Sequence, residues 1–399
     1  MKYFKRIVAF ALAMIMAFSV SVFAEEPASS ELLKSKSISI PVVYSYEDFG
    51  NITDEIDQES ITVKGSNSYF KFKAKKTGFI YLGMKSDAAN KKTVKVKKTN
   101  SKGKSASTIK KSFKPGHQFF AIVPVTKDKT YRIAMNGAAA GETFYITAVN
   151  VVGGGKRYLK EYENGNCSVA AGKKTKKSNY VTYWKVADMP KGALTVFISD
   201  VYSSKLASTY ITLCNSKKKA ISAKTKVTGV KKDGNVYLSQ ATFGVDQGTY
   251  YVKVTTKAPM YGIKMKIDDS YNRRSESKKS KAVTLNEGEA RKTVLAASTS
   301  KTSHYYKVVL DQKKHVKFDV DGYIAPGTKI NLVIYDSKGK ATKTLSIKGE
   351  VNKIKTIDYG TKDALSAGTY YLAIKKDSKN TSAAYSIYYQ TSDESMIKK

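Results

Sequence analysis

Three copies of one six-residue pattern decide the fold of this chain: NSKGKS at residues 100–105, NSKKKA at 215–220 and DSKGKA at 336–341. The copies begin 115 and 121 residues apart (215 − 100 and 336 − 215). Solenoid repeats are much shorter, so this spacing predicts tandem domains. Asn or Asp at the first position can bond the backbone two residues on, and glycine in the first and third copies supplies a positive φ. Lys218 replaces that glycine in the second copy, so the turn type there can differ.

Strand signatures keep the same order around each turn. An aromatic strand precedes it at 69–72, 183–186 and 305–308, and a tyrosine-containing strand follows at 130–133, 249–252 and 369–372. A closing strand comes next, around Phe144, Tyr261 and Tyr385. Apolar and polar residues alternate in these segments, which is typical of strands with one buried face. Two sheets packed face to face bury such faces. We therefore predict an all-β protein of three tandem antiparallel β-sandwich domains with jelly-roll-like character.

The sequence also predicts where these domains begin and end. We expect sandwiches at 36–152, 156–270 and 280–392, separated by a triple-glycine stretch at 153–155 and a charged stretch at 272–278. Residues 1–24 are predicted to be a signal peptide, because basic residues precede an apolar run that ends at Ala24. An uncleaved membrane anchor is the alternative. With cleavage, the chain is expected to be secreted or at the cell surface, monomeric, and without a transmembrane segment.

Charge points to the kind of partner. The chain has 70 Lys and Arg residues against 33 Asp and Glu, a net charge of +37, or +34 (37 − 3) without the three basic residues of the signal peptide. A field of this size attracts polyanions. Outside a cell these include wall teichoic acids, acidic polysaccharides, anionic lipid surfaces and DNA. The alternative is a solvated, lysine-rich surface with no specific partner.

Tyrosine is the most abundant aromatic residue, with 28 copies. Successive side chains of a strand point to opposite faces, so one ring of each aromatic doublet should face outward. This places five rings on the outside: Tyr69, Tyr183, Tyr251, Tyr305 and Tyr371. Outward rings beside lysines suit stacking on sugars, docking to a polymer, or gripping single-stranded nucleic acid. The alternative is that tyrosine is simply a good strand former.

Catalytic and metal-binding patterns are missing from the sequence. His117, His304 and His315 form no His-Glu-x-x-His motif, no Cys-x-x-Cys is present, and no Gly-x-Ser-x-Gly marks a nucleophile. We therefore predict a protein that is not an enzyme and has no metal site or cofactor.

One acidic stretch is a candidate calcium site. Asp319-Val320-Asp321-Gly322 has the character of a loop but lacks the further ligands of an EF-hand. A second acidic cluster lies at residues 54–59 and a third at 268–269. In the alternative interpretation these carboxylates balance nearby lysines.

The two cysteines both lie in the second repeat. Cys167 and Cys214 can form a disulfide in an exported protein, or stay as two buried free thiols.

The three repeats resemble diverged tandem copies of the bacterial pre-peptidase C-terminal domain, and the third is the clearest. The resemblance rests on four segments: YYK at 305–307, LVIYDSKG at 332–339, AGTYYL at 367–372 and YSI at 385–387. It implies a jelly-roll-like sandwich that accompanies secreted peptidases, in a family where some members bind collagen or other polymers, often with calcium. No peptidase domain precedes the repeats here, and the acidic residues common before the first aromatic strand are replaced by Ser66, Asn67 and Ser68 in the first copy.

Together these features predict a secreted, non-enzymatic protein that binds an extracellular, anionic polymer or glycan, such as a cell-wall or matrix polysaccharide, through several weak sites. The alternative is an accessory interaction module for a separate secreted peptidase.

Overall fold

The structure is a computed structural model. It describes residues 32–43, 59–66, 68–86, 92–99, 105–113, 119–152, 157–159, 168–170, 173–174, 180–200, 208–227, 230–233, 236–257, 261–298, 300, 302–351 and 353–396. The predicted signal peptide, the glycine stretch at 153–155, the turn at 100–104, the acidic residues 54–57, His117 and Cys167 lie outside this part of the chain.

The first sandwich has two sheets. One has the order β1-β4-β9-β6-β7, and the other has the order β2-β10-β5-β8, with β3 also pairing with β10. The strands are β1 (Ser35–Ser37), β2 (Val42–Val43), β3 (Glu59–Thr62), β4 (Ser68–Lys73), β5 (Gly78–Ser86), β6 (Lys92–Thr99), β7 (Ser105–Phe113), β8 (Phe119–Val125), β9 (Thr130–Asn136) and β10 (Thr143–Val152).

The second sandwich repeats this arrangement. Its sheets have the orders β11-β14-β20-β16-β17, with β13 on β14, and β12-β21-β15-β19-β18. The strands are β11 (Arg157–Tyr158), β12 (Ser168–Ala170), β13 (Lys173–Lys174), β14 (Tyr180–Met189), β15 (Gly192–Asp200), β16 (Thr209–Cys214), β17 (Thr225–Val227), β18 (Val230–Asp233), β19 (Val236–Val245), β20 (Gly248–Thr256) and β21 (Tyr261–Asp268).

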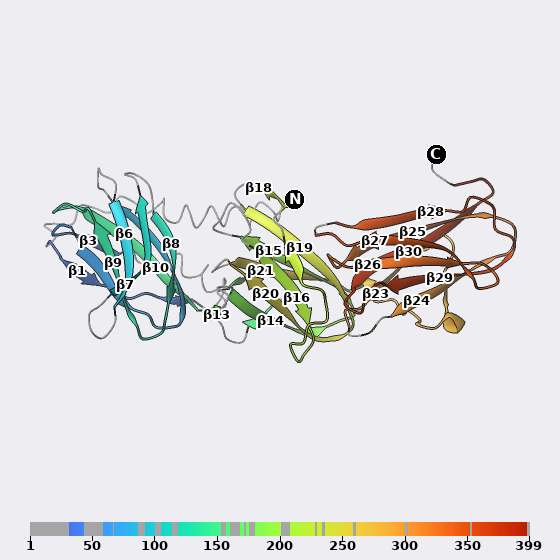
Figure 1. The fold of residues 1–399 in the computed structure, drawn as a ribbon, viewed down its shortest axis with the longest axis horizontal. Coiled ribbons are helices and arrows are strands. Elements are labelled where there is room, and N and C mark those ends of the chain that lie inside the picture. Colours follow the sequence, from blue (N-terminus) through green and yellow to red (C-terminus); the bar gives the residue numbers. More distant parts are fainter. Residues whose placement is uncertain are drawn as a thin grey trace.

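The third sandwich has the orders β22-β24-β29-β26-β27 and β23-β30-β25-β28. Its strands are β22 (Val283–Thr284), β23 (Arg291–Leu295), β24 (Ser303–Leu310), β25 (His315–Ile324), β26 (Lys329–Tyr335), β27 (Ala341–Lys348), β28 (Lys355–Gly360), β29 (Gly368–Lys376) and β30 (Ala383–Ser392). Figure 1 shows the three sandwiches in a row along the long axis, from blue at the left to red at the right.

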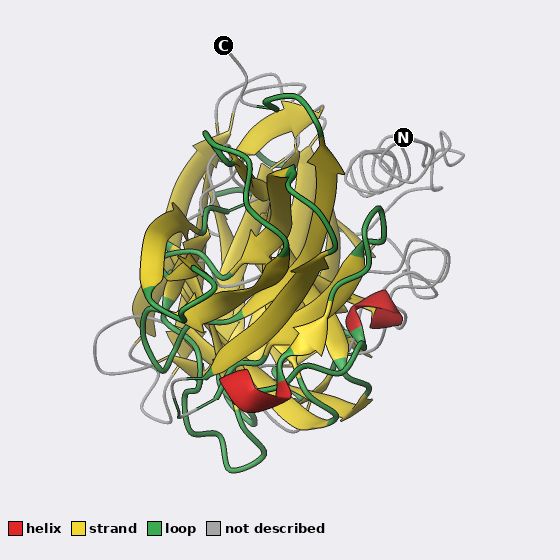
Figure 2. Ribbon diagram, turned by 90° about the vertical axis from the view of Figure 1, so that its right-hand side faces the viewer, coloured by secondary structure: helices red, strands yellow, loops and turns green. Residues whose placement is uncertain are grey.

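The repeated strand order confirms the all-β prediction of tandem sandwiches. In each repeat a short strand, β1, β11 or β22, runs parallel to the first aromatic strand, and that strand pairs antiparallel with the tyrosine-containing strand β9, β20 or β29. We call the sheets that contain β4, β14 and β24 the tyrosine sheets, and the facing sheets the partner sheets. Figure 2 shows that strands dominate the end view.

Burial alternates along the strands as the sequence predicted. In β4 the rings of Phe70 and Phe72 are buried while Lys71 and Lys73 are exposed. One hydrophobic core lies within each sandwich. Burial of the inner faces is the main favourable contribution to folding, and it fixes which side chains of the tyrosine sheets are left pointing outward.

One position in each core distinguishes the repeats. The first repeat places Phe70 and Phe144 there, both fully buried. In the second, the Trp184 indole donates a hydrogen bond to the Tyr261 hydroxyl at 3.1 Å. In the third, the hydroxyls of Tyr306 and Tyr385 bond to each other, and His304 Nδ1 lies 2.7 Å from the Tyr385 hydroxyl. Buried polar groups need hydrogen-bond partners. The second and third repeats provide these partners in different ways, whereas the first repeat has two apolar rings at this position.

The second and third sandwiches are joined by a close-packed interface. The backbone oxygen of Gly244 in β19 accepts hydrogen bonds from the Ser382 hydroxyl and from the backbone of Ala297, both at 2.9 Å. A Cβ atom on Gly244 would overlap the carbonyl oxygen of Ala383, so only glycine fits. Ala193 packs beside Val294 and Ala384 in a small apolar cluster across the same interface.

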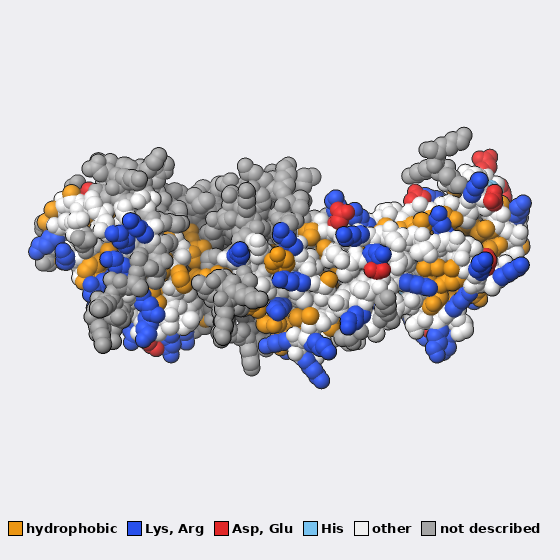
Figure 3. All heavy atoms as spheres, viewed as in Figure 1, with side chains coloured by type: hydrophobic (Ala, Val, Ile, Leu, Met, Phe, Trp, Pro, Cys, Tyr) orange, Lys and Arg blue, Asp and Glu red, His pale blue; other side chains and the backbone are white. Residues whose placement is uncertain are grey.

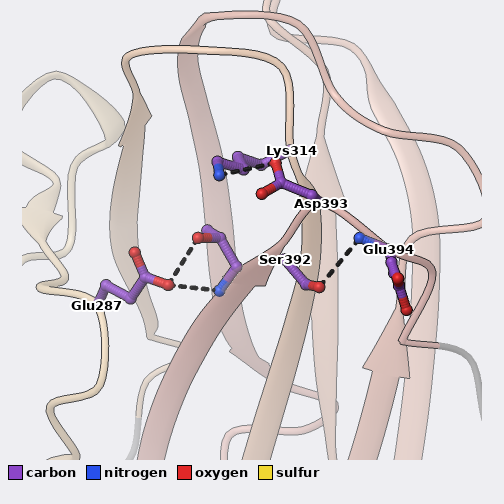
Figure 4. Close-up of polar contacts among 6 residues, drawn as sticks. Glu287, Lys314, Ser392, Asp393 and Glu394 are labelled. Atoms are coloured by element: carbon purple, nitrogen blue, oxygen red, sulfur yellow. Dashed lines mark hydrogen bonds and ion pairs between the residues drawn. The ribbon is translucent and has the colours of Figure 1, made fainter.

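The connection between these two sandwiches and the end of the chain carry local polar contacts. Two short 3-10 helices, η1 (Asp269–Tyr271) and η2 (Lys279–Lys281), lie at the surface outside the strands (Figure 2). Figure 4 shows polar contacts that hold the end of β30 in place. The Glu287 carboxylate accepts hydrogen bonds from the backbone and hydroxyl of Thr391, and Lys314 pairs with Asp393 at 2.8 Å.

Candidate functional site

The structure places all five tyrosines predicted to face outward on the tyrosine sheets, each half-buried. Tyr69 lies in β4, Tyr183 in β14, Tyr251 in β20, Tyr305 in β24 and Tyr371 in β29. Their neighbours in the chain point into the cores, so the alternation of the strands decides which ring is outward.

A local anchor positions Tyr251 and Tyr371. The preceding residue in each case is a buried tyrosine whose hydroxyl donates to a backbone oxygen four residues earlier: Tyr250 to Asp246 at 2.9 Å, and Tyr370 to Ser366 at 3.0 Å. Such a bond resembles the tyrosine corner of other β-sandwiches and fixes the start of the strand. The register of the outward ring is therefore set by its buried neighbour.

The turn after β16 has the same geometry as the turn after β26, which corrects the expectation that they can differ. The Asn215 and Asp336 side chains accept from the backbone of Lys219 and Lys340 at 3.0 and 2.8 Å. Lys218 adopts φ 61° where Gly339 adopts φ 82°. A non-glycine residue is uncommon in this left-handed region, because its Cβ crowds the backbone. Lys218 therefore holds a strained conformation that glycine accepts freely in the third repeat.

The ammonium group of Lys218 lies over two rings of its tyrosine sheet. Its Nζ is 5.0 Å from the centre of the Tyr251 ring and 5.4 Å from that of Tyr183. Lys253 Nζ approaches the Tyr183 ring at 5.6 Å. Cations within about 6 Å of a ring centre are attracted by the negative face of the ring. The turn after β16 therefore places a positive charge over the outward rings of Tyr183 and Tyr251.

The third repeat also has a lysine over two rings, but it uses a different lysine and a different second ring. Lys279, from η2 between the sandwiches, places Nζ 4.7 Å from the centres of the Tyr335 and Tyr371 rings. It also donates to the Gly339 carbonyl at 3.3 Å, and a Cβ on Gly339 would lie 2.7 Å from this Nζ. The absence of a side chain at Gly339 is what makes room for Lys279.

Strand register shows that these two lysines share one equivalent ring, Tyr251 in the second repeat and Tyr371 in the third. Their second rings differ, since Tyr183 lies in β14 and Tyr335 lies in β26. Tyr251 faces Lys185 across β14, and Tyr371 faces Lys307 across β24. In the first repeat Arg132 faces Lys71 at the same point, so an arginine stands where the others have a tyrosine. Its guanidinium lies 4.7 Å from the centre of the Tyr69 ring. All three tyrosine sheets therefore carry a cation over an outward ring.

No carboxylate of the described residues pairs with these cations. Within the described part of the chain no salt bridge involves Lys218 or Lys279; the ion pairs lie elsewhere, as in Lys36–Glu59 and Lys329–Asp377. In the view of Figure 3 lysine and arginine are spread from one end of the molecule to the other, and acidic groups are few. The tyrosine sheets can therefore attract an anionic ligand at several points.

Sequence reasoning located the rings but not the charges over them. Lys218 was recognisable, since it stands at a turn position that calls for glycine. Lys279 and Tyr335 carried no signal, because the stretch around Lys279 reads only as a charged linker.

The two described histidines, His304 and His315, have partners that indicate a structural role. His304 is buried, and desolvation together with Lys191 and Lys376 lowers its pKa to about 3, so it is neutral near pH 7. His304 Nε2 lies 3.0 Å from the Ser275 hydroxyl, and His315 Nδ1 lies 3.4 Å from the Thr361 carbonyl oxygen. Neither described histidine meets a carboxylate in a way that suits acid–base catalysis.

The acidic stretch at 319–322 lies within strand β25 and is not a loop, which corrects the prediction. Asp319 and Asp358 both pair with Lys317, and Asp321 accepts from the Thr356 hydroxyl at 2.6 Å. Among the described residues no group of three or more His, Cys, Asp or Glu side chains could hold a metal ion. These carboxylates balance local donors, which was the alternative interpretation.

Cys214 is a buried free thiol, and burial raises its pKa. The other cysteine of the predicted disulfide, Cys167, lies outside the described residues, so that pairing stays a prediction. No helix among the described residues is long and apolar enough to cross a membrane.

No protein-family model matches the chain, and no curated protein matches it. Solved structures similar to it include the triple jelly roll protein of an archaeal virus turret (12% identity, 89% of this chain and 97% of that chain, TM-score 0.20). A second is the CBM22-1-CBM22-2 tandem domain of Paenibacillus barcinonensis Xyn10C (9% identity, 58% of this chain and 89% of that chain, TM-score 0.20). A third is the delta-endotoxin Cry8Ea1 of Bacillus thuringiensis (9% identity, 86% of this chain and 55% of that chain, TM-score 0.20). TM-scores this low support no functional argument, so function is argued below from the chain itself.

Proposed function

We propose that this protein is a secreted, non-enzymatic binding protein that holds an extracellular anionic polymer on its three tyrosine sheets. One observation supports this more than any other: each tyrosine sheet presents a cation over an outward tyrosine ring. A single exposed site of this kind binds weakly. Three sites on one chain raise the overall affinity when the polymer is long enough to contact them together.

The net charge of +37 supports the same proposal. Long-range attraction brings a polyanion to the surface, and the ring-bound cations give it defined points of contact. The predicted signal peptide at residues 1–24 supports the location of such a polymer outside the cell. Wall or matrix polysaccharide and teichoic acid are the candidates of suitable charge.

Retention on purified cell-wall material in a salt gradient tests this function. We expect retention at low salt and release as ionic strength rises, because counterions screen exposed charges. A neutral glucan column serves as the control and should not retain the protein. Binding that ignores salt, or equal retention on the neutral column, would contradict the proposal. Recovery of a peptidase from culture medium without retention on the wall would favour the accessory role that the family resemblance implies.

A further inference from the structure

Among the described residues, Lys218 and Lys279 have a property that the other lysines lack. Each is drawn over two rings at once, so the position of its Nζ is restricted. A group that is already ordered loses less conformational entropy when a ligand binds. The rings hold one side of the ammonium, and its remaining N–H donors are available to an acceptor on the solvent side.

Backbone strain points to a role for the charge at Lys218. The third repeat shows that glycine satisfies this turn, with the same hydrogen bonds to Asp336 that Lys218 and Lys219 make to Asn215. Lysine at φ 61° is the less favourable choice for folding. In the third repeat, where glycine is present, Lys279 from a distant segment supplies the charge instead. Two unrelated positions thus deliver an ammonium to one point of the fold.

The cations also change what the tyrosines can do. A ring whose outer face is covered by an ammonium is not open to a stacked sugar, so Tyr251 and Tyr371 serve to position charge. Tyr305 differs: no cation of the described residues lies over it, and it faces the small side chain of Ala373 across β29. On the tyrosine sheet of the third repeat, anion contact is therefore assigned to Lys279 and sugar stacking to Tyr305.

We infer that Lys218 and Lys279 are two seats built on one equivalent ring, each of which receives one oxyanion of the bound polymer, a phosphate or a carboxylate, with the two tyrosines beneath it acting as a positioning platform. This inference rests on the proposed function and names the ligand group that its second and third sheets recognise. Charge complementarity selects the oxyanion, since neither ammonium has a carboxylate partner within the described part of the chain.

Paired variants separate a specific seat from general charge. Lys218→Gly removes the seat of the second repeat, and Lys219→Gly removes the same charge from an exposed neighbour in the same turn. Lys279→Gln and the exposed control Lys281→Gln do the same for the third repeat. Affinity for short-chain inorganic polyphosphate and for polygalacturonate is measured by calorimetry at one fixed salt concentration. Each seat variant should lose about tenfold in affinity for the preferred probe, and each control about twofold or less.

A relocation variant tests the geometry itself. Lys279→Gln with Gly339→Lys moves the third repeat's lysine to the turn position used in the second repeat, and affinity should return to within about twofold of the original protein. Lys279→Gln with Ser337→Lys restores the same net charge at an exposed neighbouring position and should not restore binding. Melting temperature is followed throughout, and Lys218→Gly should not lower it, so that a loss of affinity is not a loss of folding.

The outcomes distinguish the seats from the proposed function. Equal losses in seat and control variants, or equal rescue by Lys at 337 and 339, would overturn the seats while leaving salt-dependent polymer binding intact. An original protein that binds neither probe nor wall material would overturn both. A preference for polyphosphate points to a phosphate-bearing polymer, and a preference for polygalacturonate to an acidic polysaccharide.

Discussion

The second and third repeats carry the same charge at the same point of the same sheet, yet they obtain it from different parts of the sequence. Lys218 comes from the turn that follows β16, whereas Lys279 comes from the connection that precedes β22. Each choice constrains the turn, since Lys218 strains it and a side chain at position 339 would displace the Lys279 ammonium. Two repeats can therefore place a charge at the same point in space although the lysines that carry it come from different positions in the repeated sequence.

The same two repeats also differ in their buried polar groups, and the largest expected effect lies there. His304 has a pKa of about 3 in the folded protein against an ordinary value of 6.5. Between these values the unfolded chain binds a proton that the folded chain does not, so the stability of the third repeat falls as pH drops from about 6.5 toward 3. The full loss is up to roughly 5 kcal/mol. Urea denaturation across this pH range measures it.

His304→Gln should flatten this acid dependence, because glutamine does not titrate. His315→Gln is the control, and its profile should follow that of the original protein. The second repeat has the non-titrating residue Thr182 at the position of His304, so we expect no acid loss from this position there. An unchanged slope in His304→Gln would show that other groups cause the acid loss.

The interface between the two repeats gives the next largest effect. Gly244→Val should destabilise the protein by about 3 kcal/mol, since the new side chain would overlap the Ala383 backbone and crowd Val294. Scanning calorimetry should then show the second and third repeats unfolding in separate transitions. Ala220→Val, at an exposed site of the second repeat, is the control. A single sharp transition in Gly244→Val would mean that this interface does not couple the two repeats.

Removing one hydroxyl from each core compares the two polar pairs directly. Tyr385→Phe leaves both His304 and Tyr306 without their shared partner and should cost about 2 kcal/mol. Tyr261→Phe removes the bond from the Trp184 indole and should cost about 1 kcal/mol. Tyr388→Phe, at a half-exposed hydroxyl, should change little. Equal costs at 385 and 261, measured by urea denaturation, would contradict the idea that the third repeat depends more on its buried network.

The smallest expected effect has the opposite sign. Lys218→Gly should stabilise the protein by about 1 kcal/mol, because glycine adopts the left-handed conformation without crowding. This gain exceeds the lost attraction between the ammonium and the rings, which is about 0.5 kcal/mol at an exposed site. Lys217→Gly, at a residue outside the left-handed region, should give no gain. A lower melting temperature in Lys218→Gly would show that the cation contributes more than the strain costs.

Sequence periodicity was sufficient for the fold because strands with one buried face must alternate. The spacing of apolar residues at 70 and 72 and at 306 and 308 identified the inner faces correctly, and with them the outward position of Tyr69 and Tyr305. The same reasoning failed at 319–322, where two aspartates and a glycine suggest a loop. There the outward carboxylates meet Lys317 and Thr356 from the same sheet, and the strand continues through them.

What the order of residues settled, then, was the class of fold and the faces on which the tyrosines lie, since both depend on a local period of two. Tertiary structure alone decided which cations meet those rings, because Lys279 is 56 residues before Tyr335 and 92 before Tyr371 (335 − 279 and 371 − 279). It also decided that Gly244 must remain glycine, since the atoms that exclude a side chain belong to the next sandwich. Contacts between distant segments leave no periodic trace in the chain that makes them.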